Sequence, residues 1–257
     1  MKKVFFILFT GILFLLACST SNLSDGTKLY RIMIGDKISH EFNYNEKGLI
    51  SNQIIYGIPD KKMLEINYHY DSKDRLIKTD SYTDVSSSTI SQQLVYGYTD
   101  FIYRADGTLI EEIAYTKKGN QYEFASKTLL SYNAAGRTLS RLQVSIDNQP
   151  FNLYKYEYNA AGNIIIMESY QYDGPTPKLG FRSVYEHDNK KNPYIDLSVI
   201  PFSVNSNNIV KATVTNYNIT PGFPVVTTTH TVYKNYNSSQ LPVEVVEYGT
   251  TFTYLYK

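Results

Sequence analysis

The five-residue sequence Tyr-Asn-Ala-Ala-Gly occurs twice in this chain, beginning at Tyr132 and again at Tyr158, 26 residues later. Asparagine at the first position of a turn and glycine at the fourth are preferences of the type I turn. Glycine also accepts the left-handed backbone that closes a bulged hairpin. The glycines of the four clear copies, each predicted to close a tight turn, are Gly48, Gly107, Gly136 and Gly162. Looser copies, also predicted to be turns, begin at Tyr70, His187 and Tyr236.

Between these turns lies a second set of breaker clusters, such as residues 58–60 and 147–150, so each repeat consists of two strands and two turns. The intervening segments alternate in polarity. For example, Leu64 and Ile66 lie on the face opposite Glu65. Strands of ordinary length then give about 14–16 strands in an antiparallel meander. The sequence therefore predicts one all-β repeat domain over residues 28–257, rolled into an open or closed barrel.

The N-terminal segment has a different composition. Lys2 and Lys3 precede an apolar run that ends at residue 17, which is typical of a secretory signal peptide. Cys18 follows directly and is the only cysteine, so the chain forms no internal disulfide. Residues 18–27 are small and polar, which predicts a flexible tether. Leu-Leu-Ala-Cys at residues 15–18 resembles the lipobox of bacterial lipoproteins.

The turn sequence also carries a resemblance. The pattern Tyr-x-Tyr-Asn-x-x-Gly over residues 156–162 resembles the YD repeats of the Rhs family. Together with the lipobox, the 25 tyrosines and the length, it more specifically resembles a group of Bacteroidota-type lipoproteins of unknown function with a porin-like β-fold. That resemblance implies acyl chains on Cys18 as the contact with the membrane. It also implies an outer-membrane location, on the periplasmic or the surface side.

Composition and motifs argue against several functions. The formal net charge is +1, which does not favour nucleic-acid binding because that needs a basic excess. The four histidines are scattered, and no nucleotide-binding or nucleophile motif is present, so we expect no metal and no cofactor. Glu111 and Glu112 are adjacent on a predicted strand and therefore point to opposite faces, which is unsuitable for paired-acid catalysis.

The tyrosines are the remaining candidates for function. Tyrosine rings stack on sugar faces or peptide side chains while their hydroxyls form hydrogen bonds. The alternative interpretation is cross-strand packing that only stabilises the sheet. The candidate ligand-stacking residues lie on two strands: Tyr68, Tyr70, Tyr154, Tyr156 and Tyr158.

These observations favour a lipid-anchored protein of the cell envelope that acts without catalysis, as a binding or structural module for a glycan or an envelope protein. Two alternatives remain at this point. One is a porin-like barrel inserted in the membrane, which needs an apolar outer belt. The other is an envelope hydrolase that uses carboxylates carried on its strands.

Overall fold

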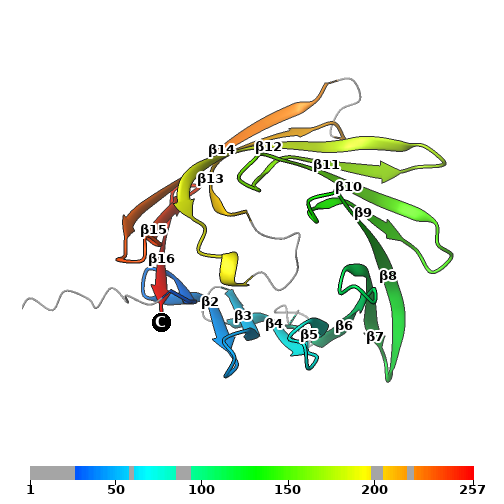
Figure 1. Cartoon of the computed structure of the whole chain (residues 1–257), viewed down its shortest axis with the longest axis horizontal. Helices are drawn as coiled ribbons and strands as arrows, with labels where there is room; N and C mark the ends of the chain where they lie inside the picture. Colours follow the sequence, from blue (N-terminus) through cyan, green and yellow to red (C-terminus); the bar gives the residue numbers. More distant parts are fainter. Residues whose placement is uncertain (1–26, 58–60, 85–93, 198–204, 219–222) are drawn as a thin grey trace, which may run out of the picture.

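The computed structural model describes residues 27–57, 61–84, 94–197, 205–218 and 223–257 (Figure 1). The predicted signal peptide, Cys18 and most of the tether lie outside these ranges. The described residues form 16 strands and one short 3-10 helix. In chain order they are β1 (Leu29–Ile34), β2 (Lys37–Tyr44), β3 (Ile50–Gly57), β4 (Lys61–Tyr70), β5 (Leu76–Asp84), β6 (Leu94–Tyr103), β7 (Leu109–Lys118), β8 (Gln121–Tyr132), β9 (Thr138–Val144), β10 (Pro150–Tyr158), β11 (Ile164–Tyr172), β12 (Pro177–Lys191), η1 (Ile195–Leu197), β13 (Asn207–Asn216), β14 (Val225–Tyr236), β15 (Pro242–Glu247) and β16 (Thr250–Tyr256).

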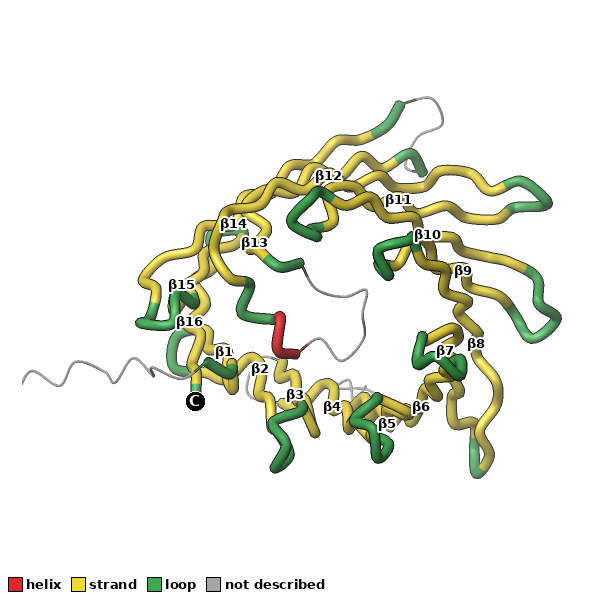
Figure 2. The backbone as a smooth tube through the Cα atoms, in the orientation of Figure 1, coloured by secondary structure: helices red, strands yellow, loops and turns green. Residues whose placement is uncertain are grey.

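The strands form a closed barrel in which every pairing is antiparallel and consecutive strands are neighbours. The ring closes where β1 pairs with β16, with Leu29 opposite Tyr256 and Ile32 opposite Tyr254. This seam continues beyond the strands, because Lys28 N donates to Lys257 O at 3.1 Å and Lys257 N donates to Lys28 O at 3.0 Å. The prediction of an all-β antiparallel meander rolled into a barrel is confirmed, and the barrel is closed (Figure 2).

The repeated sequence forms tight turns at one end of the barrel, which we call the tight-turn rim. In each copy the fourth turn residue donates its backbone N–H to the first, as in Gly136 N to Asn133 O at 3.0 Å. The four predicted glycines all have positive φ: Gly48 (77°), Gly107 (88°), Gly136 (74°) and Gly162 (91°). The strand register shifts by a bulge at the tyrosine before each of these turns, for example between Glu157 and Tyr158. Each repeat is therefore a bulged hairpin.

Six tyrosines at the ends of strands tie neighbouring hairpins together: five of them precede a tight turn, and Tyr256 ends β16 at the seam. The hydroxyl of each donates to the backbone carbonyl of the first residue of the preceding strand, as Tyr132 does to Leu109 O at 2.7 Å. The full set is Tyr44 to Leu29, Tyr70 to Ile50, Tyr103 to Leu76, Tyr132 to Leu109, Tyr158 to Thr138 and Tyr256 to Pro242. The accepting residues are almost completely buried. This tyrosine ladder explains why the tyrosine and the turn repeat as one unit.

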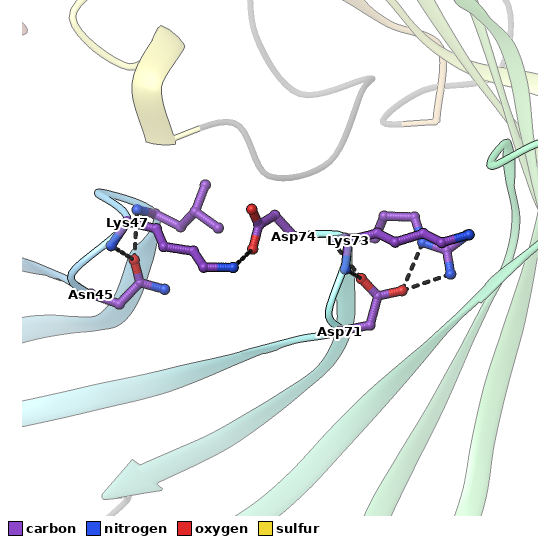
Figure 3. A network of polar contacts seen from close by, with 7 residues as sticks. Asn45, Lys47, Asp71, Lys73 and Asp74 are labelled. Atoms are coloured by element: carbon purple, nitrogen blue, oxygen red, sulfur yellow. Dashed lines mark hydrogen bonds and ion pairs between the residues drawn. The ribbon is translucent and has the colours of Figure 1, made fainter.

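Polar side chains reinforce the turns and link them sideways (Figure 3). Asn45 Oδ1 accepts from Lys47 N at 3.1 Å and from Leu49 N at 3.0 Å, so the asparagine caps its own turn. Lys47 Nζ then reaches the next turn and lies 2.5 Å from Asp74 Oδ1. Because both partners are well exposed, we expect this ion pair to contribute at most about 1 kcal/mol. It links two neighbouring turns and adds little to the stability of the barrel.

One predicted turn is wrong. Residues 187–191 belong to β12, which continues to Lys191 with irregular pairing to β13. Asp188 accepts hydrogen bonds from Lys190 N at 2.9 Å and from Asn208 Nδ2 at 2.9 Å, so it caps a bulge instead of closing a hairpin. After β12 the chain turns into the ring, where η1 lies inside the outline of the barrel (Figure 2).

We expect replacement of Gly136 by valine to lower the free energy of unfolding by about 1–2 kcal/mol, because a β-carbon is strained at positive φ. An added β-carbon would meet no atom within 4 Å, so the strain comes from the backbone alone. Gly136→Asn should cost much less, since the equivalent turn positions hold Asp74 at φ 61° and Gln240 at φ 60°. Urea denaturation of both variants tests this, and equal losses would contradict it.

Candidate functional site

The inner face of the barrel wall is identified by the segment that folds into the ring. The hydroxyls of Tyr194, just before η1, and Tyr254 on β16 are 2.7 Å apart, with ring centroids at 5.9 Å. Tyr194 and Leu197 pack on a buried cluster of the wall. Directly paired residues of neighbouring strands share a face. The register therefore assigns every paired residue to the inner or the outer face, starting from Tyr254.

The outer face carries ion pairs on the strands from β1 to β5 and from β11 to β15. Arg31, adjacent to the inward Ile32, pairs with Glu41 at 3.1 Å, and Lys234, adjacent to the inward Tyr233, lies 3.7 Å from Glu244. The other outward ion pairs are Lys62–Glu65, Lys78–Asp80, Arg182–Glu168 and Lys211–Glu186, and His69 Nε2 lies 2.6 Å from Asp80 Oδ2. These positions lie within the strands. Along β1–β5 and β11–β15 the outer wall is therefore charged where a membrane barrel would be apolar.

The inner face carries an ion pair of a different kind. Glu112 on β7 is only 9% exposed, and its Oε2 accepts from Arg141 Nη2 on β9 at 2.7 Å. The two side chains meet across β8, where Thr128 lies opposite Glu112 and is 5% exposed. Glu112 Oε1 is buried and has no hydrogen-bond partner in the described part of the chain. This is a desolvated charge pair on the inner wall.

Burial dominates the electrostatics of this pair. Desolvation raises the pKa of the Glu112 carboxyl, although the Arg141 guanidinium acts in the opposite direction. Desolvation also raises the pKa of the Tyr156 hydroxyl, while the charge of Arg141 and a hydrogen bond with it oppose the rise. Arg141 therefore connects a carboxylate on one side with a tyrosine on the other. The arrangement offers a guanidinium, an aromatic ring and hydroxyls to a polar ligand.

The predicted stacking tyrosines divide into three kinds. Tyr70 and Tyr158 belong to the tyrosine ladder, so their hydroxyls are held by backbone carbonyls. Tyr68 donates to Gln53 Oε1 at 3.0 Å on another part of the wall, and burial raises its pKa to about 12.

The third kind lies beside Arg141. Tyr154 is directly paired with Arg141 in the sheet, and Tyr156 is 8% exposed on the same strand. Next to them, Asn152 Nδ2 donates to Gln143 Oε1 at 2.9 Å. The structure therefore brings Tyr154 and Tyr156 together with the ion pair and leaves Tyr68 and Tyr70 elsewhere, on β4. We call Glu112, Arg141, Gln143, Tyr154 and Tyr156 the inner-wall cluster.

Sequence reasoning missed Arg141 and the role of Glu112. These residues are 29 positions apart and lie on different hairpins. The signal that could have found them is the alternation of inward and outward residues along β7 and β9, counted from the turn at the start of each strand. The bulge at the tyrosine before each turn shifts that parity by one, as between Ser131 and Tyr132. Counting by twos through the repeat therefore fails.

In the described ranges, no three histidine, cysteine or acidic residues come together as a metal site. None of the helical structure described is long and apolar enough to span a bilayer.

No protein family and no curated protein sequence matches this chain. Among solved structures, a porin-like protein from Bacteroides uniformis is similar with a TM-score of 0.42 and 10% identity, covering 90% of this chain and 99% of that one. A porin-like protein from Bacteroides vulgatus gives a TM-score of 0.44 at 10% identity, covering 90% and 98%. A protein of unknown function from Bacteroides fragilis gives 0.28 at 11% identity, covering 66% and 93%.

Proposed function

We propose that this protein is a non-enzymatic binding module of the cell envelope, a water-soluble barrel held at the outer membrane by acyl chains on Cys18. The observation that carries the proposal is the charged outer wall. A lysine or arginine facing lipid costs roughly 2–4 kcal/mol near the midplane of a bilayer. Arg31, Arg182, Lys211 and Lys234 all project from the outer face within strands. The barrel wall therefore suits water, and attachment falls to the lipid anchor.

The inner-wall cluster supports a polar ligand, and we propose a glycan. Tyrosine rings present flat apolar faces to sugars, while arginine and amide side chains bond to their hydroxyls. Tyr154 lies beside Arg141, and Asn152 and Gln143 form the next inward pair, two residues further along the same two strands. A hydrolase of the paired-carboxylate type would need a second acid facing Glu112. Glu112 instead faces a guanidinium, which favours binding over catalysis.

Fractionation of cells that produce the protein distinguishes a lipid-anchored barrel from a barrel inserted in the membrane. We expect the wild-type protein in the membrane fraction, released by detergent, with acyl-chain labelling on Cys18. The Cys18→Ser variant should lose the label. When it is exported behind a conventional cleavable signal, it should also move to the soluble fraction as a folded β-rich protein, as seen by circular dichroism and gel filtration.

Two outcomes contradict the proposal separately. If acyl labelling survives in Cys18→Ser, the anchor is wrong. If the unlabelled variant stays in membranes, dissolves only in detergent and conducts ions in planar bilayers, the inserted porin-like barrel is correct instead.

A further inference from the structure

The tight-turn rim repeats one more contact besides the tyrosine ladder. Each ladder tyrosine donates its hydroxyl to the carbonyl of one residue at the start of the neighbouring strand. We call the residue immediately before that acceptor in the sequence the slot residue. In three of the six repeats the slot residue is a cation that lies over the ring, and in the repeats of Tyr70 and Tyr256 it is a leucine, Leu49 or Leu241. Lys28 Nζ is 5.2 Å from the centroid of Tyr44, and the guanidinium carbon of Arg75 is 4.8 Å from that of Tyr103.

The third case shows how the cation is held. The guanidinium carbon of Arg137 is 5.7 Å from the centroid of Tyr158, and its Nη1 donates to Asn159 O at 3.1 Å. That carbonyl belongs to the first residue of the turn that follows the tyrosine. Lys28 does the same in outline, since its Nζ donates to Gly48 O at 2.8 Å. Arg75 lies over Tyr103 in the same way, but its guanidinium pairs with the Asp71 carboxylate at 2.6 Å instead of with a turn carbonyl. A cation over the ring is therefore a repeated feature of this rim, and two of the three cations add a hydrogen bond to a turn carbonyl.

The repeat at Tyr132 departs from this motif. Its hydroxyl donates to Leu109 O, so the slot residue is Thr108, whose short side chain cannot reach across the ring as arginine does. A half-open groove of about 560 Å³ lies at this place. Its lining includes Thr108, Tyr132, Asn133 and both turn glycines, Gly107 and Gly136. The groove occupies the position that corresponds to the arginine side chain in the neighbouring repeats.

The surroundings suit a cation. Asn133 begins the turn after Tyr132, as Asn159 does after Tyr158, so its carbonyl corresponds to the one that Arg137 uses. Arg104 also borders the groove, but its guanidinium lies 3.7 Å from Asp106.

We propose that the groove over Tyr132 binds a guanidinium group, of the kind carried by an arginine side chain. The cation stacks on the Tyr132 ring and donates to Asn133 O, as Arg137 does at Tyr158 and Asn159. The protein's own repeats thus supply the template for the ligand. This inference does not depend on the lipid anchor or on the inner-wall cluster.

The test is a titration of the purified full-length protein followed by ¹H–¹³C NMR of labelled tyrosine rings, with Tyr132 assigned through Tyr132→Phe. Ethylguanidinium should shift the Tyr132 ring signals saturably, with a dissociation constant on the order of millimolar. Ethylurea, which has a similar shape without charge, should give no saturable shift. N-acetyl-arginine-amide and a blocked Gly-Arg-Gly peptide should bind equally if only the side chain is recognised, whereas tighter binding of the peptide assigns the groove to a protein partner.

Thr108→Arg is the decisive variant, because it restores the motif of the neighbouring repeats and should fold. It should abolish the shift at Tyr132, while the matched variant Thr108→Val, which leaves the groove open, should retain it. Circular dichroism confirms folding of both variants. An unchanged titration in Thr108→Arg, an equal response to ethylurea, or no saturable shift in the wild type would each overturn the proposal.

Discussion

Arg141→Leu should lower the free energy of unfolding by about 3–5 kcal/mol, because removal of one partner leaves the other charge buried and unpaired. Glu112 is 9% exposed and its Oε2 loses the 2.7 Å contact with Arg141, while its Oε1 already has no partner among the described residues. The double variant Glu112→Leu/Arg141→Leu should recover much of this loss, since two apolar side chains leave no buried charge. Urea unfolding of the single and double variants measures the difference, and a double variant as unstable as the single one would contradict this reasoning.

The same variant should respond to pH in a defined direction. Burial already raises the pKa of Glu112 in the wild type, and loss of Arg141 removes the charge that opposes the rise. A carboxyl whose folded pKa lies above its unfolded value of about 4.3 favours folding below that value and loses this contribution as pH rises through the folded pKa. The deficit of Arg141→Leu relative to the wild type should therefore shrink from pH 7 to pH 4. In the Glu112→Gln/Arg141→Leu control, which has no ionisable group at position 112, the stability deficit relative to the wild type should stay constant over this pH range.

Tyr256→Ala should also cost about 3–5 kcal/mol, the range for removal of a buried aromatic side chain. Tyr256 is 1% exposed at the seam of the barrel, and its hydroxyl donates to Pro242 O at 2.6 Å. Tyr256→Phe keeps the ring and leaves that carbonyl without its donor, so it should cost about 1–3 kcal/mol.

Phe223→Ala is the control for the seam, because Phe223 is 74% exposed and its replacement should change stability by less than about 0.5 kcal/mol. Thermal unfolding followed by circular dichroism ranks the three variants. If Tyr256→Ala unfolds no earlier than Phe223→Ala, the seam does not hold the ring closed.

The architecture was largely readable because its signals are local. A turn sequence such as Asn133 to Gly136 determines its own geometry, and alternation within a single strand needs no partner. Closure was not readable, because nothing in Lys28 or Lys257 alone indicates that their backbones pair. The misplaced turn at residues 187–191 has a similar cause: Asp188 caps a bulge through Asn208, which is 20 residues away.

The candidate site was harder to predict for a physical reason. The aromatic character of Tyr154 and Tyr156 is visible in the sequence, but their neighbours depend on register. The bulges at the ladder tyrosines also shift the inward parity in the β6–β7 and β8–β9 hairpins, so local alternation does not reveal that Glu112 and Arg141 share a face. Their ion pair follows from the accumulated register of β7, β8 and β9.

The seam has a topological consequence. Because β1 and β16 pair antiparallel like all other neighbours, and Lys28 and Lys257 bond to each other's backbone, the two ends meet as a hairpin without its turn. Each strand therefore pairs with two neighbours in the same antiparallel way, and the pairing pattern has no first or last strand. A short linker from residue 257 to residue 28, with the chain reopened between two other strands at the end opposite the tight turns, would give a circular permutant with the same 16 pairings and the same tyrosine ladder.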